Sequence, residues 1–138
     1  MAVSFRIIPA HFLVYIHYDG WMGIAESTRA LGEIVAHPDY RKGMRELVDL
    51  SDLTDWERDF PAIMRHQALE AELHDDPHRP TTVVCLAPSE ETRSLARIVN
   101  RAWDRSGRIV AVVVESEPEA LSVLGVDKPS IAALLQSA

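Results

Sequence analysis

The sequence predicts an α/β fold built on a mixed, five-stranded sheet. Two extended apolar runs open the chain, and a short proline-containing break between them is typical of an antiparallel hairpin. From residue 23 onward, segments with a helical period alternate with short apolar runs, which predicts parallel strands joined by right-handed crossovers. At 138 residues, the chain is long enough for one buried core and too short for two. We therefore expect a single domain over residues 1–138.

The hairpin is expected to pair Val3–Ile8 with Phe12–His17 across Pro9-Ala10-His11. Tyr18-Asp19-Gly20-Trp21 is expected to end the second strand. A helix then runs over about residues 23–37, and its apolar stripe is predicted from the 3.6-residue period. The stripe comprises Ile24, Thr28, Leu31 and Val35, with Ala25 and Ile34 on its flank.

The stretch Met44–Trp56 is expected to hold the third strand, Arg45–Leu50, followed by an acidic turn. Five polar residues crowd this turn: Asp49, Ser51, Asp52, Thr54 and Asp55. The next helix is expected to begin after Asp55 or Asp59 as its N-cap. Its predicted buried side comprises Phe60, Ile63, Met64, Ala68, Leu69 and Leu73.

The second half repeats the alternation of strand and helix. Thr81–Ala87 and Ile109–Val114 are continuous apolar runs, as expected of strands that are buried on both faces. Ser89 is a predicted N-cap for the helix between them, and Ser116 with Glu119 has the spacing of a capping box for the helix after them. A last short helix is expected from about Pro129 through Ile131, Leu134 and Leu135.

Composition restricts the classes of function. The formal charge is −7, with 21 acidic and 14 basic residues, which argues against binding to nucleic acid or to an anionic membrane surface. No stretch approaches the ~20 apolar residues of a membrane span, and the N-terminal run does not have the pattern of a signal peptide. Cys85, in a predicted strand, is expected to be a buried core residue. We therefore expect a cytoplasmic protein without membrane insertion.

Polar and aromatic residues gather where the predicted strands end. Carboxyl ends of parallel strands share one edge of the sheet, which is the usual ligand-binding edge. The expected binding residues there are Tyr18, Asp19, Trp21, Asp49, Ser51, Asp52, Thr54, Trp56 and Ser89. The alternative interpretation is structural, because N-caps and Asx turns need the same polar residues, and aromatic residues can pin the start of a helix.

Motifs for catalysis or for a resident cofactor are absent from the sequence, so we expect no cofactor. His66, His74 and His78 with Asp75 and Asp76 have the residue types of a metal site, but they lack compact ligand spacing. The simpler expectation is a solvated link between a helix and a strand. A hydrolase that uses Asp49, Asp52 and His17 is the remaining catalytic alternative.

Two motifs, Leu47–Trp56 (LVDLSDLTDW) and Glu119-Ala120-Leu121 before Leu124-Gly125, resemble those of the SpoIIAA-like superfamily of STAS and SEC14-type domains. The resemblance covers nearly the whole chain. It implies a mixed five-stranded sheet with helices packed mainly on one face, and a regulatory or binding role without catalysis. Members that antagonise anti-sigma factors carry a phosphorylatable serine after the third strand. No such serine motif is present here, and Ser51 and Thr54 are the nearest hydroxyl groups.

The resemblance and the polar strand ends together predict a non-catalytic regulatory or binding domain. Its expected partner is another protein or a small apolar or anionic ligand. The main alternative is a homodimeric interaction protein, in which a second subunit covers a sheet face that the helices leave open.

Overall fold

The computed structural model describes residues 2–74, 78–104 and 107–137, within which strands and helices alternate as predicted. The elements are β1 (Val3–Ile8), η1 (Pro9–His11), β2 (Leu13–Met22), α1 (Ile24–Ala36), β3 (Arg45–Trp56), α2 (Phe60–Leu73), β4 (Thr81–Leu86), α3 (Glu90–Asn100), η2 (Arg101–Trp103), β5 (Ile109–Val114), α4 (Glu117–Leu124) and α5 (Ile131–Gln136).

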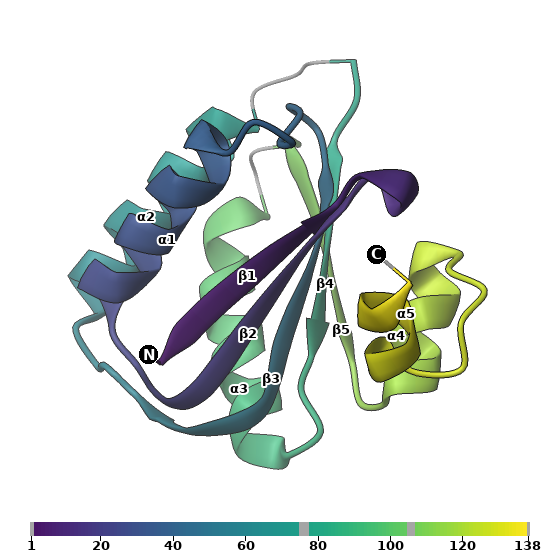
Figure 1. Ribbon diagram of the computed structural model, residues 1–138. Helices are drawn as coiled ribbons and strands as arrows, with labels where there is room; N and C mark the ends of the chain where they lie inside the picture. Colours follow the sequence, from purple (N-terminus) through teal and green to yellow (C-terminus); the bar gives the residue numbers. More distant parts are fainter. Residues whose placement is uncertain (1, 75–77, 105–106, 138) are drawn as a thin grey trace.

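The five strands form one sheet in the order β1-β2-β3-β4-β5 (Figure 1). β1 pairs with β2 in antiparallel orientation, and every later pair is parallel. This arrangement confirms the predicted α/β fold with its N-terminal hairpin. The interior strand β4 is buried over most of its length, which explains why its sequence is a continuous apolar run.

Helices cover both faces of this sheet. The three longer helices, α1, α2 and α3, pack on one face, and the two short helices α4 and α5 pack on the other (Figure 1). The expectation that the helices lie mainly on one face is therefore confirmed. We call the two sides the α1–α3 face and the α4–α5 face. Since α4 and α5 cover part of the second face, the argument that a second subunit must cover it is weakened.

The predicted strand ends were wrong for β2 and β3. Tyr18–Trp21 does not end β2, and the polar residues after Leu50 do not form a turn, because both segments continue as paired strands to Met22 and Trp56. The pairing of β2 with β3 shifts register twice, beside Asp19 and beside Gly20, as at a β-bulge. Gly20 takes a positive φ of 81° there. β2 and β3 thus extend past the end of β4. There they form a two-stranded ribbon that curls toward the starts of α1 and α2 (Figure 1).

The predicted buried faces of α1 and α2 also need correction. In α1 the buried side chains are Ser27, Ala30, Leu31 and Ile34, whereas Val35 is exposed. In α2 they are Ile63, Gln67, Glu70 and Ala71, whereas Phe60, Met64 and Leu69 are exposed. Helix α2 therefore directs polar side chains inward, since its inner face meets polar partners rather than close-packed apolar side chains alone.

The predicted helix ends are largely confirmed. Asp59, Ser89 and Ser116 cap α2, α3 and α4 by accepting hydrogen bonds from backbone N–H groups of the first turn. The reciprocal capping box occurs at Ser89 with Thr92; at Ser116 the hydroxyl itself donates to the Glu119 carboxylate. These caps fix where each helix starts relative to the sheet.

Candidate functional site

The residues predicted to form one binding edge are divided between the two faces of the sheet. Side chains alternate along a strand, so neighbouring positions in β2 and β3 point to opposite sides. Asp49 and Ser51 lie on the α4–α5 face, where they line a surface groove beside Tyr15 and Leu135. Tyr18 and Trp56 instead line a cavity on the α1–α3 face. The sheet itself separates the two sets.

On the α4–α5 face, Asp49 is the centre of a short polar network. It is only 5% exposed, and its carboxylate accepts hydrogen bonds from the Tyr15 hydroxyl and from the Ser51 hydroxyl and backbone N–H. The pKa of Tyr15 is raised well above its usual range, mainly by burial and secondly by the hydrogen bond to Asp49. The network therefore holds a carboxylate in place with fixed neutral donors.

His17 and Asp52 form a separate pair further along the ribbon. His17 Nε2 lies 2.7 Å from Asp52 Oδ2, and the Asp52 side chain is largely exposed. The Ser51 hydroxyl donates to Asp49 rather than to His17. The arrangement thus lacks the nucleophile-to-base hydrogen bond that would activate a serine.

The other predicted residues are spread around the same end of the sheet. Asp19 is exposed, Trp21 is 47% exposed, and the Thr54 hydroxyl donates to the Gly20 carbonyl oxygen at 3.0 Å. Ser89 is occupied as the N-cap of α3. The structural interpretation therefore accounts for Thr54 and Ser89, while Trp21 is an exposed aromatic side chain at the edge of the ribbon.

The α1–α3 face encloses a cavity of about 90 Å³ between the sheet and its three helices. Its wall is mostly apolar, with side chains from β2, β3, β4 and all three helices. Typical wall residues are Ile16, Ile34, Leu50, Ile63, Val83 and Leu95. Native cores contain few voids larger than a water molecule, so a cavity of this size marks incomplete packing between the sheet and these helices.

Two hydroxyl groups lie in the wall of this cavity. Ser27 donates its only hydroxyl proton to the Gly23 carbonyl oxygen, so the Tyr18 hydroxyl is the donor in the 2.8 Å bond to Ser27. Burial raises the pKa of Tyr18 well above its usual range. Tyr18 is therefore a neutral wall residue and not an exposed residue of the strand end.

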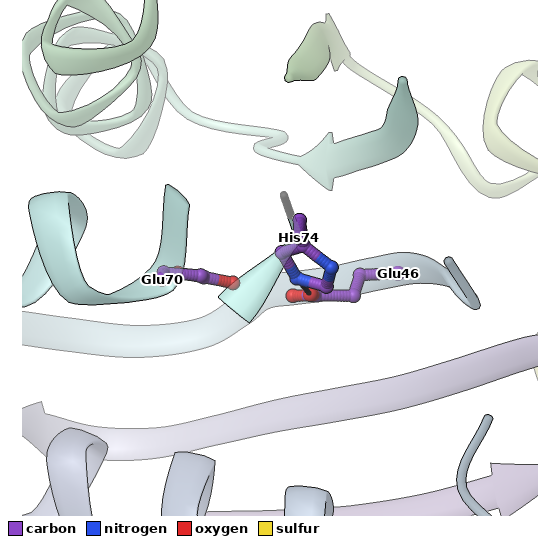
Figure 2. Close-up of side chains that lie close together, drawn as sticks. All are labelled: Glu46, Glu70 and His74. Carbon is purple, nitrogen blue, oxygen red and sulfur yellow. Dashed lines mark hydrogen bonds and ion pairs between the residues drawn. The ribbon is translucent and has the colours of Figure 1, made fainter. Parts of the chain in front are cut away.

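Three ionisable side chains meet in the interior, at one end of the cavity (Figure 2). Glu46 of β3 and Glu70 of α2 line the cavity, and His74 follows the last turn of α2. His74 Nε2 shares a 2.7 Å hydrogen bond with Glu46 Oε2, and all three side chains are buried. The prediction that His74 belongs to a solvated link was wrong, because the side chain is only 2% exposed and hydrogen-bonds to Glu46 and Thr81.

Burial controls the protonation of this cluster. It raises the pKa of Glu46, an effect that the neighbouring Glu70 carboxyl group partly offsets. Burial and the negative charge of Glu46 raise the pKa of Glu70 well above its ordinary value. Burial lowers the pKa of His74. Neutral forms of these groups are thus favoured over charged ones.

Of the other residues of the predicted histidine cluster, His66 lies beside Glu70, and the rest are exposed or outside the described residues. His66 shares a 3.0 Å hydrogen bond with Thr28 of α1, and its Nε2 is 3.9 Å from Glu70. His78 is exposed, and Asp75 and Asp76 lie outside the described residues.

Reasoning from sequence missed Glu46 and Glu70. Glu46 stands in a strand whose neighbours Leu47 and Leu50 are apolar, and Glu70 and His74 are four residues apart on one helix face. That spacing was a usable signal, but only the packing of α2 on β3 brings Glu46 to it.

Comparison with known proteins supports the fold alone. No protein-family model matches the sequence, and no curated protein is similar to it. Among solved structures, an uncharacterised protein of the DUF3478 family from Shewanella loihica PV-4, described as having a SpoIIAA-like fold, superposes with a TM-score of 0.54. The match covers 89% of this chain and 92% of that chain, at 17% sequence identity.

This chain has a SpoIIAA-like fold. The resemblance predicted from LVDLSDLTDW is thereby confirmed at the level of architecture. Across the described residues, no helix is both long and apolar enough to span a bilayer.

Proposed function

We propose that this chain is a non-catalytic, cytoplasmic binding domain that takes a small, neutral, apolar ligand into the cavity of the α1–α3 face. The observation that carries this proposal is the cavity itself, of about 90 Å³ and lined mainly by apolar side chains. One water needs roughly 10–15 Å³, and an engineered apolar cavity of about 150 Å³ binds benzene. A slender hydrocarbon chain or a small ring matches this range.

The charges near the cavity favour a neutral ligand over an anionic one. Its ionisable wall residues include Glu46, Glu57 and Glu70, and none of the described lysines or arginines lines it. An anion would be repelled by any carboxylate that is ionised and would lose its hydration without a cationic partner. The anionic ligand that the sequence left open is therefore the weaker candidate.

A route into the cavity runs between α1 and α2. A surface groove there shares Ile24, Glu57 and His66 with the cavity wall. The Thr28–His66 hydrogen bond joins the two helices across this groove. Separation of α1 from α2 at this exposed bond would admit a ligand without disturbing the sheet.

Filling the cavity tests the proposal. Ala96 of α3 is fully buried and lines the cavity, so Ala96→Leu should occupy space that the ligand needs. With benzene as the neutral probe, we expect saturable binding by calorimetry with the unmodified chain and at least tenfold weaker binding for Ala96→Leu. The matched control is Ala68→Leu, which adds the same atoms at an exposed position of α2 and should leave binding unchanged.

Failure of either comparison would count against the cavity. If benzene does not bind, or binds Ala96→Leu and Ala68→Leu equally, the ligand site is not here. Fluorescence of Trp56 and Trp103, which line the cavity, offers a second readout, since a bound ligand should shift their emission.

The open edge at β5 favours homodimerisation as a second candidate. Within the described part of the chain β5 pairs with β4 alone, its sequence IVAVVV carries no charge or proline, and Val110 is 49% exposed. An apolar edge strand of this kind is a template for pairing with another strand. Sedimentation of the chain and of Val110→Lys tests it: a dimer that the lysine dissociates supports pairing through β5, and a monomer in both cases removes it.

A further inference from the structure

We propose that Glu46, Glu70 and His74 form a binding site for a divalent transition-metal ion of the Zn²⁺ class. This inference goes beyond ligand binding in the cavity and rests on different observations. The three residues come from two elements, β3 and the carboxyl end of α2, and their side chains point toward one another (Figure 2). Each is at least nine-tenths buried.

The spacing of the donor atoms suits a single ion. One oxygen from each glutamate and one ring nitrogen of His74 all lie within 4.8 Å of one another. Ligand atoms bound to one zinc ion at about 2.0–2.2 Å lie roughly 3–4 Å apart. Small side-chain rotations therefore bring all three to the ion, and the backbone of α2 and β3 can stay in place.

An unpartnered oxygen points to something that the cluster binds. Glu46 Oε2 is hydrogen-bonded to His74, but Glu46 Oε1 is buried and has no hydrogen-bond partner among the described residues. A buried carboxylate oxygen without a partner costs free energy, so such atoms are rare in folded proteins. A cation bound by Glu46 would satisfy this oxygen.

His74 is already oriented as a metal ligand would be. Its Nδ1 lies 3.3 Å from the Thr81 hydroxyl, which leaves Nε2 directed at Glu46. Histidines that bind metals through one nitrogen usually donate the other N–H to an oxygen, which fixes the ring orientation. Thr81 is buried and supplies that oxygen from the first residue of β4.

The charges in the site also favour a divalent cation. Two ionised glutamates and a neutral histidine carry a charge of −2, which is prohibitively costly in an apolar interior. A divalent ion neutralises both carboxylates at once.

The donor set selects the class of ion. Two carboxylates and one imidazole suit Zn²⁺ and related transition metals, whereas Mg²⁺ and Ca²⁺ prefer oxygen ligands and retained water. Glu46 and Glu70 border the cavity, so an ion can reach them through the groove between α1 and α2.

Metal titration of the chain tests this site. After treatment with a chelator and dialysis, we expect Zn²⁺ to bind with a stoichiometry of one by calorimetry and to raise the melting temperature, and Mg²⁺ to do neither. Co²⁺ should give visible absorption bands from a coordinated nitrogen. Glu70→Gln and His74→Gln should each weaken binding at least tenfold, and Thr81→Val about tenfold through loss of the oxygen that orients His74.

The matched control is His17→Gln. It removes a histidine that also lies 2.7 Å from a carboxylate but on the exposed ribbon, and it should leave the affinity for Zn²⁺ unchanged. If the folded chain binds no Zn²⁺, Co²⁺ or Mn²⁺ up to about millimolar concentration, or if His17→Gln alone abolishes binding, the buried site does not exist. Should Glu70→Gln or His74→Gln fail to fold, Thr81→Val still decides, because unchanged affinity in that variant would refute the role of His74. Benzene binding is measured separately, so loss of the metal site and loss of the cavity ligand are distinguishable.

Discussion

The two faces of this sheet are packed in different ways. On the α4–α5 face, short helices lie over fully buried side chains such as Leu47, Val84 and Leu134. On the α1–α3 face, longer helices enclose a cavity, and α2 directs Gln67 and Glu70 inward. The length of a helix therefore does not predict how completely it fills the space beneath it. Binding is expected where packing is incomplete, and structural support where it is complete.

Substitutions on the two opposite faces of β3 should give the largest difference in the free energy of unfolding. Leu47→Ala removes a fully buried side chain from the α4–α5 face and should lower the free energy of unfolding by about 4–5 kcal/mol, near the upper end for such changes. Leu50→Ala enlarges a cavity that already exists, so we expect about 2–3 kcal/mol. Urea denaturation of both variants measures the difference. Equal losses would show that the two faces are equally well packed.

Adding side-chain volume instead of removing it should separate the two faces in the same direction. Ala96 of α3 and Ala120 of α4 are both fully buried, on opposite faces of the sheet. Ala120→Leu overfills a packed core and should destabilise the fold by about 1–3 kcal/mol, whereas Ala96→Leu fills a cavity and should be neutral or stabilising by up to about 1 kcal/mol. Melting temperatures of the two variants are the measurement, and a destabilised Ala96→Leu would mean that the cavity cannot accept added atoms.

The same difference explains how far the sequence could predict the structure. The strands β1, β4 and β5 and the caps Ser89 and Ser116 follow from local patterns, so they were predicted correctly. The α4 positions Ala120, Leu121 and Leu124 were also correct, because a close-packed face imposes a regular apolar spacing.

Prediction failed where packing is irregular. Helix α2 buries Glu70 and exposes Phe60, which reverses the pattern that hydrophobic periodicity assumes. The ends of β2 and β3 were misplaced because polar residues such as Asp52 and Thr54 are typical of turns. Here they belong to a two-stranded ribbon that continues the pairing of β2 with β3. The Glu46–Glu70–His74 cluster depends on a contact between two elements, which no local pattern in the sequence encodes.

Reactivity of a single thiol gives the finest comparison of the two faces. Cys85 faces the cavity, and burial raises the pKa of its thiol to about 12, from 9.0 when unburied. The folded pKa is the higher one, so the stability from the buried neutral thiol is complete below about pH 9 and is lost as the pH rises through 12. At pH 8, ionisation of this thiol therefore does not shift the folding equilibrium. The rate of labelling at that pH reports local opening of the structure.

We expect N-ethylmaleimide to label Cys85 at pH 8 much more slowly in the folded chain than in urea, but measurably, because α1 and α2 can separate at the Thr28–His66 bond. The matched probe is Val84→Cys in a Cys85→Ala background, which places the thiol one residue away and on the α4–α5 face. Labelling there should be at least about tenfold slower, since opening that face requires unfolding of packed core. Mass spectrometry of timed samples measures both rates. Equal rates would mean that the cavity face opens no more readily than the packed face, which would also remove the proposed ligand route between α1 and α2.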